Sequence, residues 1–341
     1  MSRKIKAIVC EAIADDIGSV LLRTLDLADP GPGEVQVELK ACAVNFPDLL
    51  MIQGKYQFKP PMPFAPGGEA AGNVVACGPD VDAYAPGDTV VLSLRYGGFA
   101  EVVNVTLDQL RPMPKAMDYA QAAAYQTAYL TAYVALKSRG DLQPGETLLV
   151  HGATGGVGMA AVEMGKYLGA TVIATGGRDD KLDVVKSRGA DHVINYTQAD
   201  GTLGGFRDTV KALTDGRGAD VIYDPVGGDV FDESMRCINW GGRILTIGFT
   251  SGRWPQAPVN LILIKQISVI GVRAGEYGRR DPDKGKEVSD ALYALADSGA
   301  IKPYISHALP LEQAVDAMRL LENREVIGKA VVTMNGYVYS T

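Results

Sequence analysis

The stretch "VHGATGGVGMAAVEMGKYLGA" (Val150–Ala170) decides the fold of this chain. It places glycines at 152, 155, 156 and 158 directly after an apolar run and directly before an amphipathic one. Backbone N–H groups at a helix N-terminus are unpaired, and the helix dipole favours negative charge there. Glycine also lets the backbone approach a pyrophosphate closely. With a second apolar run at 171–175, the stretch predicts a dinucleotide-binding β-α-β unit. A glycine turn that serves packing alone is the alternative.

The type of dinucleotide depends on the end of the second strand. An NAD site places Asp or Glu there, about 20 residues after the glycines, to hold the ribose 2′-hydroxyl. This chain reads "VIATGGRDDK" (172–181), with small residues at that point and Arg178 and Lys181 close behind. A carboxylate would repel a 2′-phosphate and cations attract it, so the segment predicts NADPH. Asp179 and Asp180 weaken the argument, and Arg178 and Lys181 as ordinary surface residues of a helix start are the alternative.

Outward from this unit, apolar runs alternate with helical patterns. The runs lie at 147–151, 171–175, 192–195, 220–223, 243–247 and 267–272. A β-α-β-α series predicts an α/β fold with a doubly wound parallel sheet, covered on both faces. The run "NLILIKQISVIGV" (260–272) fits an edge strand used for association or, equally, an internal strand of the sheet.

The first 120 residues have a different pattern. Short strand-like segments such as "EVQVELKACAV" (34–44) alternate with Gly/Pro turns, which predicts a compact barrel-like sheet. An alanine-rich helix is expected over 118–140, ending at Gly140, and two more helices after about residue 285. A chain of 341 residues is long enough for two such domains.

Composition excludes several classes of partner. The net charge is −7 and no Lys/Arg-dense window is present, which argues against nucleic acid. No apolar run is long enough to span a bilayer, and the N-terminal apolar piece breaks at Glu11, so we expect a cytoplasmic protein. The 4 cysteines and 3 histidines are scattered, which predicts neither a disulfide framework nor a metal site.

Several motifs together resemble a known family. "PGETLLVHGATGGVG" (144–158), "NFPDLLMIQGKY" (45–56), "PGGEAAGNVVACGPDV" (66–81) and "GKAVV" (328–332) are similar to motifs of the medium-chain dehydrogenase/reductases, in the zinc-independent quinone oxidoreductase (zeta-crystallin) branch. The resemblance implies a Rossmann domain at 125–264 and a GroES-like β-barrel catalytic domain formed by 1–124 and 265–341. It also implies a homodimer or homotetramer.

At the positions of the zinc ligands, this sequence differs from the zinc-dependent members of that family, and the difference limits the reactions that we expect. Asn45 stands where they carry cysteine, Gly68 where they carry histidine, and neither residue type occurs near Thr127. Without zinc, an alcohol lacks the Lewis acid that stabilises its alkoxide, whereas a conjugated acceptor needs less help. We therefore expect NADPH-dependent hydride transfer to a quinone or an α,β-unsaturated carbonyl. An enoyl-CoA (acrylyl-CoA-like) reductase and a non-catalytic NADPH-binding protein are the alternatives.

The resemblance also assigns cofactor contacts. In this assignment, the pyrophosphate is bound by the glycine turn: Gly155, Gly156, Val157 and Gly158. The 2′-phosphate is bound by Gly176, Arg178 and Lys181, and the adenosine side contacts Tyr196. Backbone and side chains near the nicotinamide are Gly248, Phe249, Gly271 and Val272.

Three residues are candidates for catalysis. Asn45 and Tyr56 would donate hydrogen bonds to the substrate carbonyl, and Thr131 would hydrogen-bond at the nicotinamide. In the alternatives, Asn45 supports a loop, Tyr56 is a pocket wall and Thr131 bonds back to its own helix. We expect Asp48 to order the loop that holds Asn45, Glu69 to be a buried structural carboxylate, and His151 to be a strand-end residue.

Overall fold

The computed structural model describes residues 2–340, and the chain divides into two units. The first comprises Met1–Gln126 with Ala296–Thr341, and the second comprises Thr127–Leu295. The first boundary lies close to the expected one, but the chain returns to the first unit at Ala296 and not at residue 265. The reason is strand β13 (Ser268–Gly271), which pairs in parallel with β12 (Ile238–Thr246) and so keeps this segment in the second unit.

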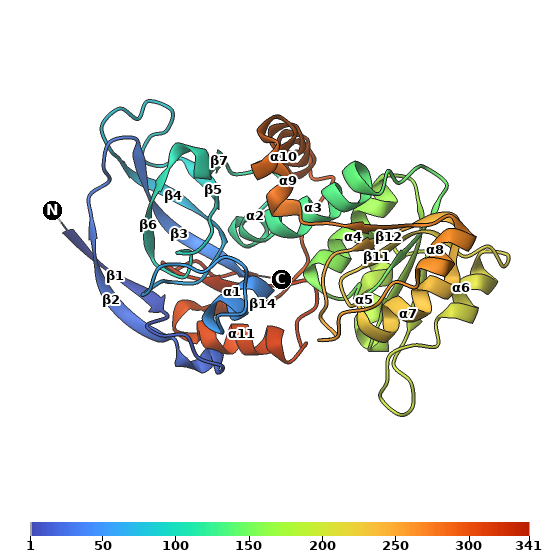
Figure 1. Ribbon diagram of the computed structural model, residues 1–341. Coiled ribbons are helices and arrows are strands. Elements are labelled where there is room, and N and C mark those ends of the chain that lie inside the picture. Colours follow the sequence, from blue (N-terminus) through green and yellow to red (C-terminus); the bar gives the residue numbers. More distant parts are fainter. Residues whose placement is uncertain (1, 341) are drawn as a thin grey trace. The chain divides into compact units, whose positions relative to one another are not determined.

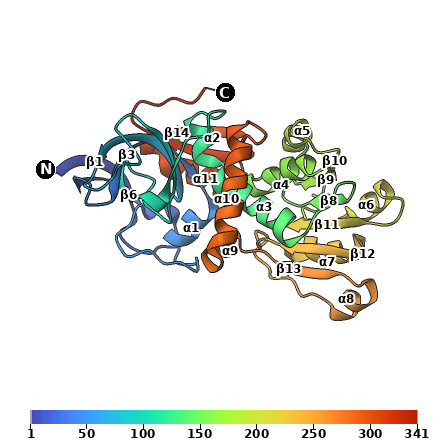
Figure 2. The ribbon, with the colours of Figure 1, turned by 90° about the horizontal axis from the view of Figure 1, so that it is seen from above.

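The second unit is built on a parallel sheet. Its other strands are β8 (Thr147–Val150), β9 (Thr171–Gly176), β10 (His192–Asn195) and β11 (Ala219–Asp224). Its helices are α3 (Gln126–Tyr133), α4 (Gly156–Tyr167), α5 (Asp179–Ser187), α6 (Arg207–Leu213), α7 (Gly228–Cys237), α8 (Val259–Lys265), α9 (Ala274–Arg280) and α10 (Pro282–Asp297). The strand order is β10-β9-β8-β11-β12-β13, so the chain starts in the middle and builds outward in both directions; Figure 1 labels β11 and β12 of this sheet, and Figure 2 labels all of its strands. This order confirms the doubly wound sheet and creates a switch point between β8 and β11.

Alternate residues of the strands cover the two faces of this sheet. A Cβ on Gly165 of α4 would lie 2.5 Å from Leu148 and 3.1 Å from Val172, so these side chains face α4. The next residues, Leu149 and Ile173, pack instead in a cluster with α6, α7 and α8. Because helices cover both faces, the strands are apolar throughout, which is why they appear in the sequence as continuous apolar runs.

Two segments differ in detail from the sequence expectation. The expected helix over 118–140 is divided at Tyr125 into α2 (Tyr119–Ala124) and α3, and continues as a π-helical turn (Val134–Arg139) that ends at Gly140. The run 260–272 is half helix and half strand: Gln266, with φ of 51°, ends α8, and β13 follows at the edge of the sheet (Figure 2).

The first unit contains a mixed, mostly antiparallel sheet. Its strands are β1 (Ser2–Val9), β2 (Leu21–Ala28), β3 (Glu34–Val44), β4 (Glu69–Cys77), β5 (Thr89–Ser93), β6 (Val102–Thr106), β7 (Leu110–Pro112), β14 (Ile305–Pro310) and β15 (Lys329–Thr333). Its helices, besides α2, are α1 (Phe46–Ile52) and α11 (Ala314–Glu322). The order is β14-β15-β3-β4-β5-β7, with β6 also paired to β3 and with β1 and β2 as a separate hairpin. The β-rich N-terminal region is thus confirmed, and residues 305–333 complete its sheet.

Strand β3 is the centre of this unit and ends at the candidate site. Cys42 and Val44 belong to the main core cluster, together with Leu49 of α1. Ala43, on the opposite face, packs against Ala120 of α2. The end of β3 is therefore buried on both faces, and it fixes the position of the next residue, Asn45. No helix within residues 2–340 has the length and apolar character needed to cross a bilayer.

Candidate functional site

The glycine turn of the second unit connects β8 to α4, as expected. Gly152 has φ of 56°, a conformation that side chains rarely adopt, and Gly155 is the N-cap of α4. The first hydrogen bond of the helix runs from Met159 N to Gly155 O at 2.8 Å. The three preceding N–H groups, on Gly156, Val157 and Gly158, therefore have no acceptor within the helix.

Different glycines of this turn have different tasks. A Cβ on Gly158 would lie 2.3 Å from the Gly152 carbonyl oxygen, so the turn closes only with glycine there. A Cβ on Gly176, at the end of β9, would lie 2.9 Å from the Thr154 side chain, which places β9 directly against the turn. A Cβ on Gly155 would meet no protein atom closer than 3.6 Å. A Cβ at Gly155 would therefore fit with an ordinary van der Waals contact to the Gly152 carbonyl oxygen.

The two expected 2′-phosphate cations differ in environment. Arg178 is the exposed N-cap of α5, and its guanidinium donates two hydrogen bonds to Asp180, at 2.9 and 2.6 Å. Lys181 lies in the first turn of α5 and is only 5% exposed. To bind a phosphate, Arg178 must exchange Asp180 for the ligand.

The switch point brings a second loop against the glycine turn. A Cβ on Gly152 would lie 3.3 Å from Val226 and 3.4 Å from Pro225, and one on Gly248 would lie 3.4 Å from the Pro225 carbonyl oxygen. Pro225 therefore lies between the glycine turn and Gly248, one of the expected nicotinamide neighbours. A Cβ on Gly227 would lie 3.0 Å from the ring of Phe249.

Asp224, at the end of β11, holds this second loop in place. Its Oδ1 accepts hydrogen bonds from the N–H groups of Val226 and Gly227, at 2.8 and 2.9 Å. Its Oδ2 is buried and has no hydrogen-bond partner within residues 2–340. Burial raises the pKa of Asp224 to about 6. No role was expected for Asp224 from the sequence, although "DPVGG" (224–228) directly after an apolar run is a usable signal.

His151 is a core residue and not a proton carrier, as expected. Its Nδ1 and Nε2 lie 2.8 Å from the hydroxyls of Thr175 and Ser234. Ser234 donates its own proton to the Val230 carbonyl, so its oxygen accepts the Nε2–H of His151. Burial lowers the pKa of His151 to about 3, so the ring is neutral at physiological pH.

The other expected cofactor residues lie in varied environments. Tyr196 is only 6% exposed and packs in the core cluster of α6 and α7, so its contact with adenosine stays a prediction. Phe249 is 42% exposed. Gly271 ends β13 and pairs with Thr246, and Val272 follows it. The Thr131 hydroxyl donates to the Thr127 carbonyl at 2.7 Å, which is the helix bond named above as its alternative.

In the first unit, Asn45 belongs to a buried network that sequence analysis foresaw only in part. Its Nδ2 donates to Glu69 Oε1 at 3.0 Å. The ammonium of Lys329 donates to Asn45 Oδ1 at 2.6 Å and to Glu69 Oε1 at 3.0 Å. Glu69 is 1% and Lys329 is 6% exposed, so this is a buried ion pair with an amide between its partners. Glu69 is the buried carboxylate we expected. Lys329 was missed, although a lysine that opens the apolar strand "KAVVT" was a usable signal.

Asp48 and Cys42 complete the surroundings of Asn45. Asp48 accepts hydrogen bonds from the N–H groups of Asn45 and Gly67, at 2.8 and 3.0 Å. It therefore orders this loop, although burial raises its pKa to about 6. Burial raises the pKa of the Cys42 thiol well above its ordinary value, which disfavours the reactive thiolate. Tyr56 is half-buried against the main core cluster.

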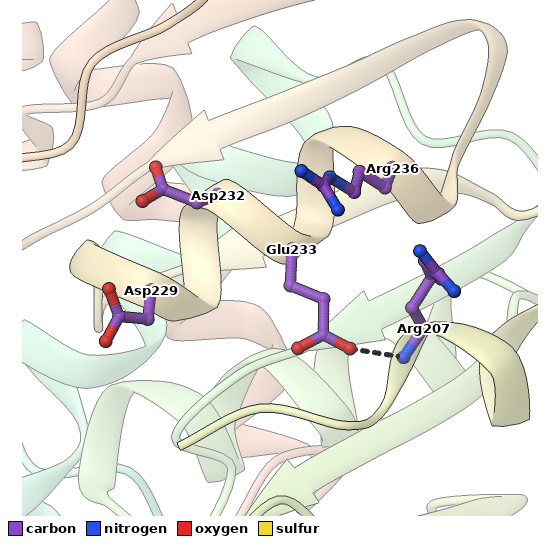
Figure 3. A pocket seen from close by; sticks show the side chains of 5 residues that line it. All are labelled: Arg207, Asp229, Asp232, Glu233 and Arg236. Carbon is purple, nitrogen blue, oxygen red and sulfur yellow. Dashed lines mark hydrogen bonds between the residues drawn. The ribbon is translucent and has the colours of Figure 1, made fainter. Parts of the chain in front are cut away.

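Neither a metal-ligand cluster nor the cavity beside α7 adds to this site. Residues 2–340 contain no group of three or more His, Cys, Asp or Glu that could hold a metal ion. A cavity of about 270 Å³ lies between α6 and α7, where Glu233 accepts a hydrogen bond from the Arg207 N–H (Figure 3). It contains none of the expected residues, and its Asp229 and Asp232 are paired with Arg253.

Comparisons with known proteins agree with this architecture. Residues 31–115 match the alcohol dehydrogenase GroES-like domain, and residues 156–293 match the zinc-binding dehydrogenase family. The first match confirms the expected GroES-like domain. Among curated proteins, the chain is 37% identical over 330 residues to quinone oxidoreductase-like protein 2 homolog of Nematostella vectensis, covering 96% of this chain and 88% of that protein.

Solved structures are similar over nearly the whole chain. A probable oxidoreductase from Mycobacterium abscessus has a TM-score of 0.86 and 34% identity, with 97% of this chain and 99% of that chain covered. Escherichia coli quinone oxidoreductase complexed with NADPH has a TM-score of 0.85 and 31% identity, with 96% of this chain and 100% of that chain covered.

Proposed function

We propose a reaction for this chain, which belongs to the quinone oxidoreductase family of medium-chain dehydrogenase/reductases. In this proposal, the protein transfers hydride from NADPH to a quinone or an α,β-unsaturated carbonyl. The family supports the coarser statement that the protein is an oxidoreductase. The observation that carries the cofactor assignment is the turn between β8 and α4, where three N–H groups have no acceptor within the helix and a Cβ on Gly155 would meet no protein atom closer than 3.6 Å.

The residues of the second unit fit a dinucleotide phosphate. The N–H groups of Gly156, Val157 and Gly158 would bind the pyrophosphate. Lys181 and Arg178 would hold the 2′-phosphate, and no carboxylate ends β9 to repel it. NADPH supplies the hydride when it is bound.

In the first unit, we propose that Asn45 acts as a hydrogen-bond donor. An amide nitrogen carries two N–H groups, and Glu69 accepts only one of those of Asn45 in the observed contact. We assign the other to the acceptor oxygen, where it stabilises the negative charge that develops after hydride addition. Because the Lys329 ammonium donates to the oxygen of the same amide, it polarises the group and makes its N–H a stronger donor. Tyr56 is the second donor in this proposal.

An NADPH-oxidation screen tests the reaction. 1,4-Benzoquinone, a naphthoquinone, a simple enone and an enoyl-CoA are each added to the chelator-treated protein at neutral pH. We expect NADPH consumption in stoichiometric amounts with at least one of them, without added metal. Tight NADPH binding without consumption by any acceptor would instead support a non-catalytic NADPH-binding protein. Zinc-dependent oxidation of ordinary alcohols would refute the proposal.

A further inference from the structure

The second unit has a cationic cavity that neither the sequence nor the family comparison assigned. It measures about 290 Å³ and lies where the π-helical turn Val134–Arg139 meets α9 and the start of α10. Four cationic side chains line it, Arg139, Arg273, Arg280 and Lys284, against two acidic ones, Glu276 and Asp281. This local excess of two positive charges belongs to a chain whose net charge is −7.

The two carboxylates leave most of these cations unsatisfied. Glu276 makes its short contact, 2.7 Å, with Arg279, which does not line the cavity. Arg280 and Arg273 are 3.6 and 3.9 Å from Glu276, too far for a hydrogen bond. Arg139 forms no hydrogen bond or ion pair within residues 2–340. Each guanidinium offers five N–H donors in a planar fork, so three arginines of the cavity have donors available for an anion.

The cavity also adjoins residues that the resemblance assigns to the nicotinamide. Its lining includes Val134 and Tyr277, which pack in the same apolar cluster as Val272. Thr131 lies three positions before Val134, about one turn away on the same helical segment. If Val272 and Thr131 contact the nicotinamide as the resemblance implies, a molecule that holds its anion here lies within reach of the reactive end of the cofactor.

We propose that this cavity binds a phosphate or diphosphate group of the hydride acceptor, as carried by a coenzyme A thioester. Guanidinium forks match phosphate oxygens, and an excess of two positive charges matches a phosphate dianion better than a single carboxylate. The proposal rests on the proposed function for the identity of the reaction and on the cavity for the ligand.

Binding of coenzyme A to the protein saturated with NADP⁺ is the direct test, because NADP⁺ occupies the cofactor's own phosphate site. Calorimetry compares the wild type with the double variant Arg273→Gln/Arg280→Gln. The matched control is Lys137→Gln/Lys286→Gln, which removes two positive charges from neighbouring positions that do not line the cavity. We expect the dissociation constant to rise at least about tenfold in the first variant and to stay within about twofold in the control.

Kinetics provide the second test. Two thioesters of the same α,β-unsaturated acyl group are compared by their KM values. One is the coenzyme A thioester, and the other is the N-acetylcysteamine thioester, which lacks phosphates. We expect a KM at least about tenfold lower for the coenzyme A form, a ratio that falls toward one in the double variant and with rising salt.

Each outcome separates the two proposals. Equal KM values, or no coenzyme A binding, with enone reduction intact would overturn the phosphate site alone. Inorganic phosphate binding as tightly as coenzyme A would also overturn it, because the cavity would then be a general phosphate site. If no acceptor oxidises NADPH, the proposed function fails, and the calorimetry still decides whether the cavity binds coenzyme A.

Discussion

At the scale of single residues, the buried pair Glu69–Lys329 determines how Asn45 is presented. Removing one charge of a buried pair leaves the other without compensation, at a cost of about 3 to 5 kcal/mol. We therefore expect Lys329→Met and Glu69→Gln each to lower the free energy of unfolding by several kcal/mol. The double variant Glu69→Gln/Lys329→Met should lose less than the sum, because no buried charge remains unpaired. Urea unfolding of the four proteins measures this coupling.

The same variants test whether the pair also acts through Asn45. In the folded double variant, the amide loses the cation that polarises it, so kcat should fall while the NADPH dissociation constant stays unchanged. Asn45→Ala should lower kcat in the wild type and have little further effect in the double variant. Additive effects on both stability and kcat would show that the three residues do not act as a unit.

At the scale of elements, two substitutions at the junction of β8 and α4 distinguish an effect on folding from an effect on cofactor binding. In Gly158→Ala, the added Cβ meets the Gly152 carbonyl, so we expect a loss of about 1 to 3 kcal/mol in stability together with weaker NADPH binding. In Gly155→Ala, the added Cβ makes only an ordinary contact, 3.6 Å from the Gly152 carbonyl oxygen, so stability should change by less than about 0.5 kcal/mol.

NADPH titration of Gly155→Ala distinguishes the two interpretations of the turn. If the pyrophosphate occupies the space above Gly155, the dissociation constant should rise about tenfold, or about 1.4 kcal/mol. Wild-type affinity in this variant would mean that the turn serves packing and that the cofactor phosphates lie elsewhere.

At the scale of the whole molecule, α8 and β13 present a surface that suits association. Val259, Leu263 and Ile264 of α8 are 76%, 78% and 67% exposed, and β13 is the edge strand of its sheet. An exposed edge strand beside apolar side chains pairs readily with a second copy. We expect a homodimer in solution that Leu263→Glu converts to a monomer.

Light scattering after size-exclusion chromatography measures the mass of each variant. Tyr167→Glu places the same charge on another exposed apolar residue, 55% exposed at the end of α4, and should leave the dimer intact. A monomeric wild type, or a dimer that persists in Leu263→Glu, would exclude this surface as the interface.

Local patterns were sufficient for the parallel sheet and its glycine turn. A strand buried on both faces needs a continuous apolar run, and a turn over a phosphate needs glycine, so β8 to β12 and the turn at Gly155 are visible in the order of residues. The same patterns did not foresee the end of α8 at Gln266 or the return of the chain at Ala296. Both features depend on which strands pair in the folded sheet. The continuous apolar run 260–272 does not by itself distinguish helix from strand.

Pairings between distant residues were decided by the tertiary structure alone. Lys329 is 260 positions from Glu69 and becomes its partner only because β15 and β4 flank β3. The cationic cavity likewise gathers Arg139 and Arg273 from segments that are far apart in an acidic chain. The order of residues specifies local conformation through sterics and hydrophobic period. Charges, in contrast, interact through space, so only the folded chain shows which of them meet and which remain available for a ligand.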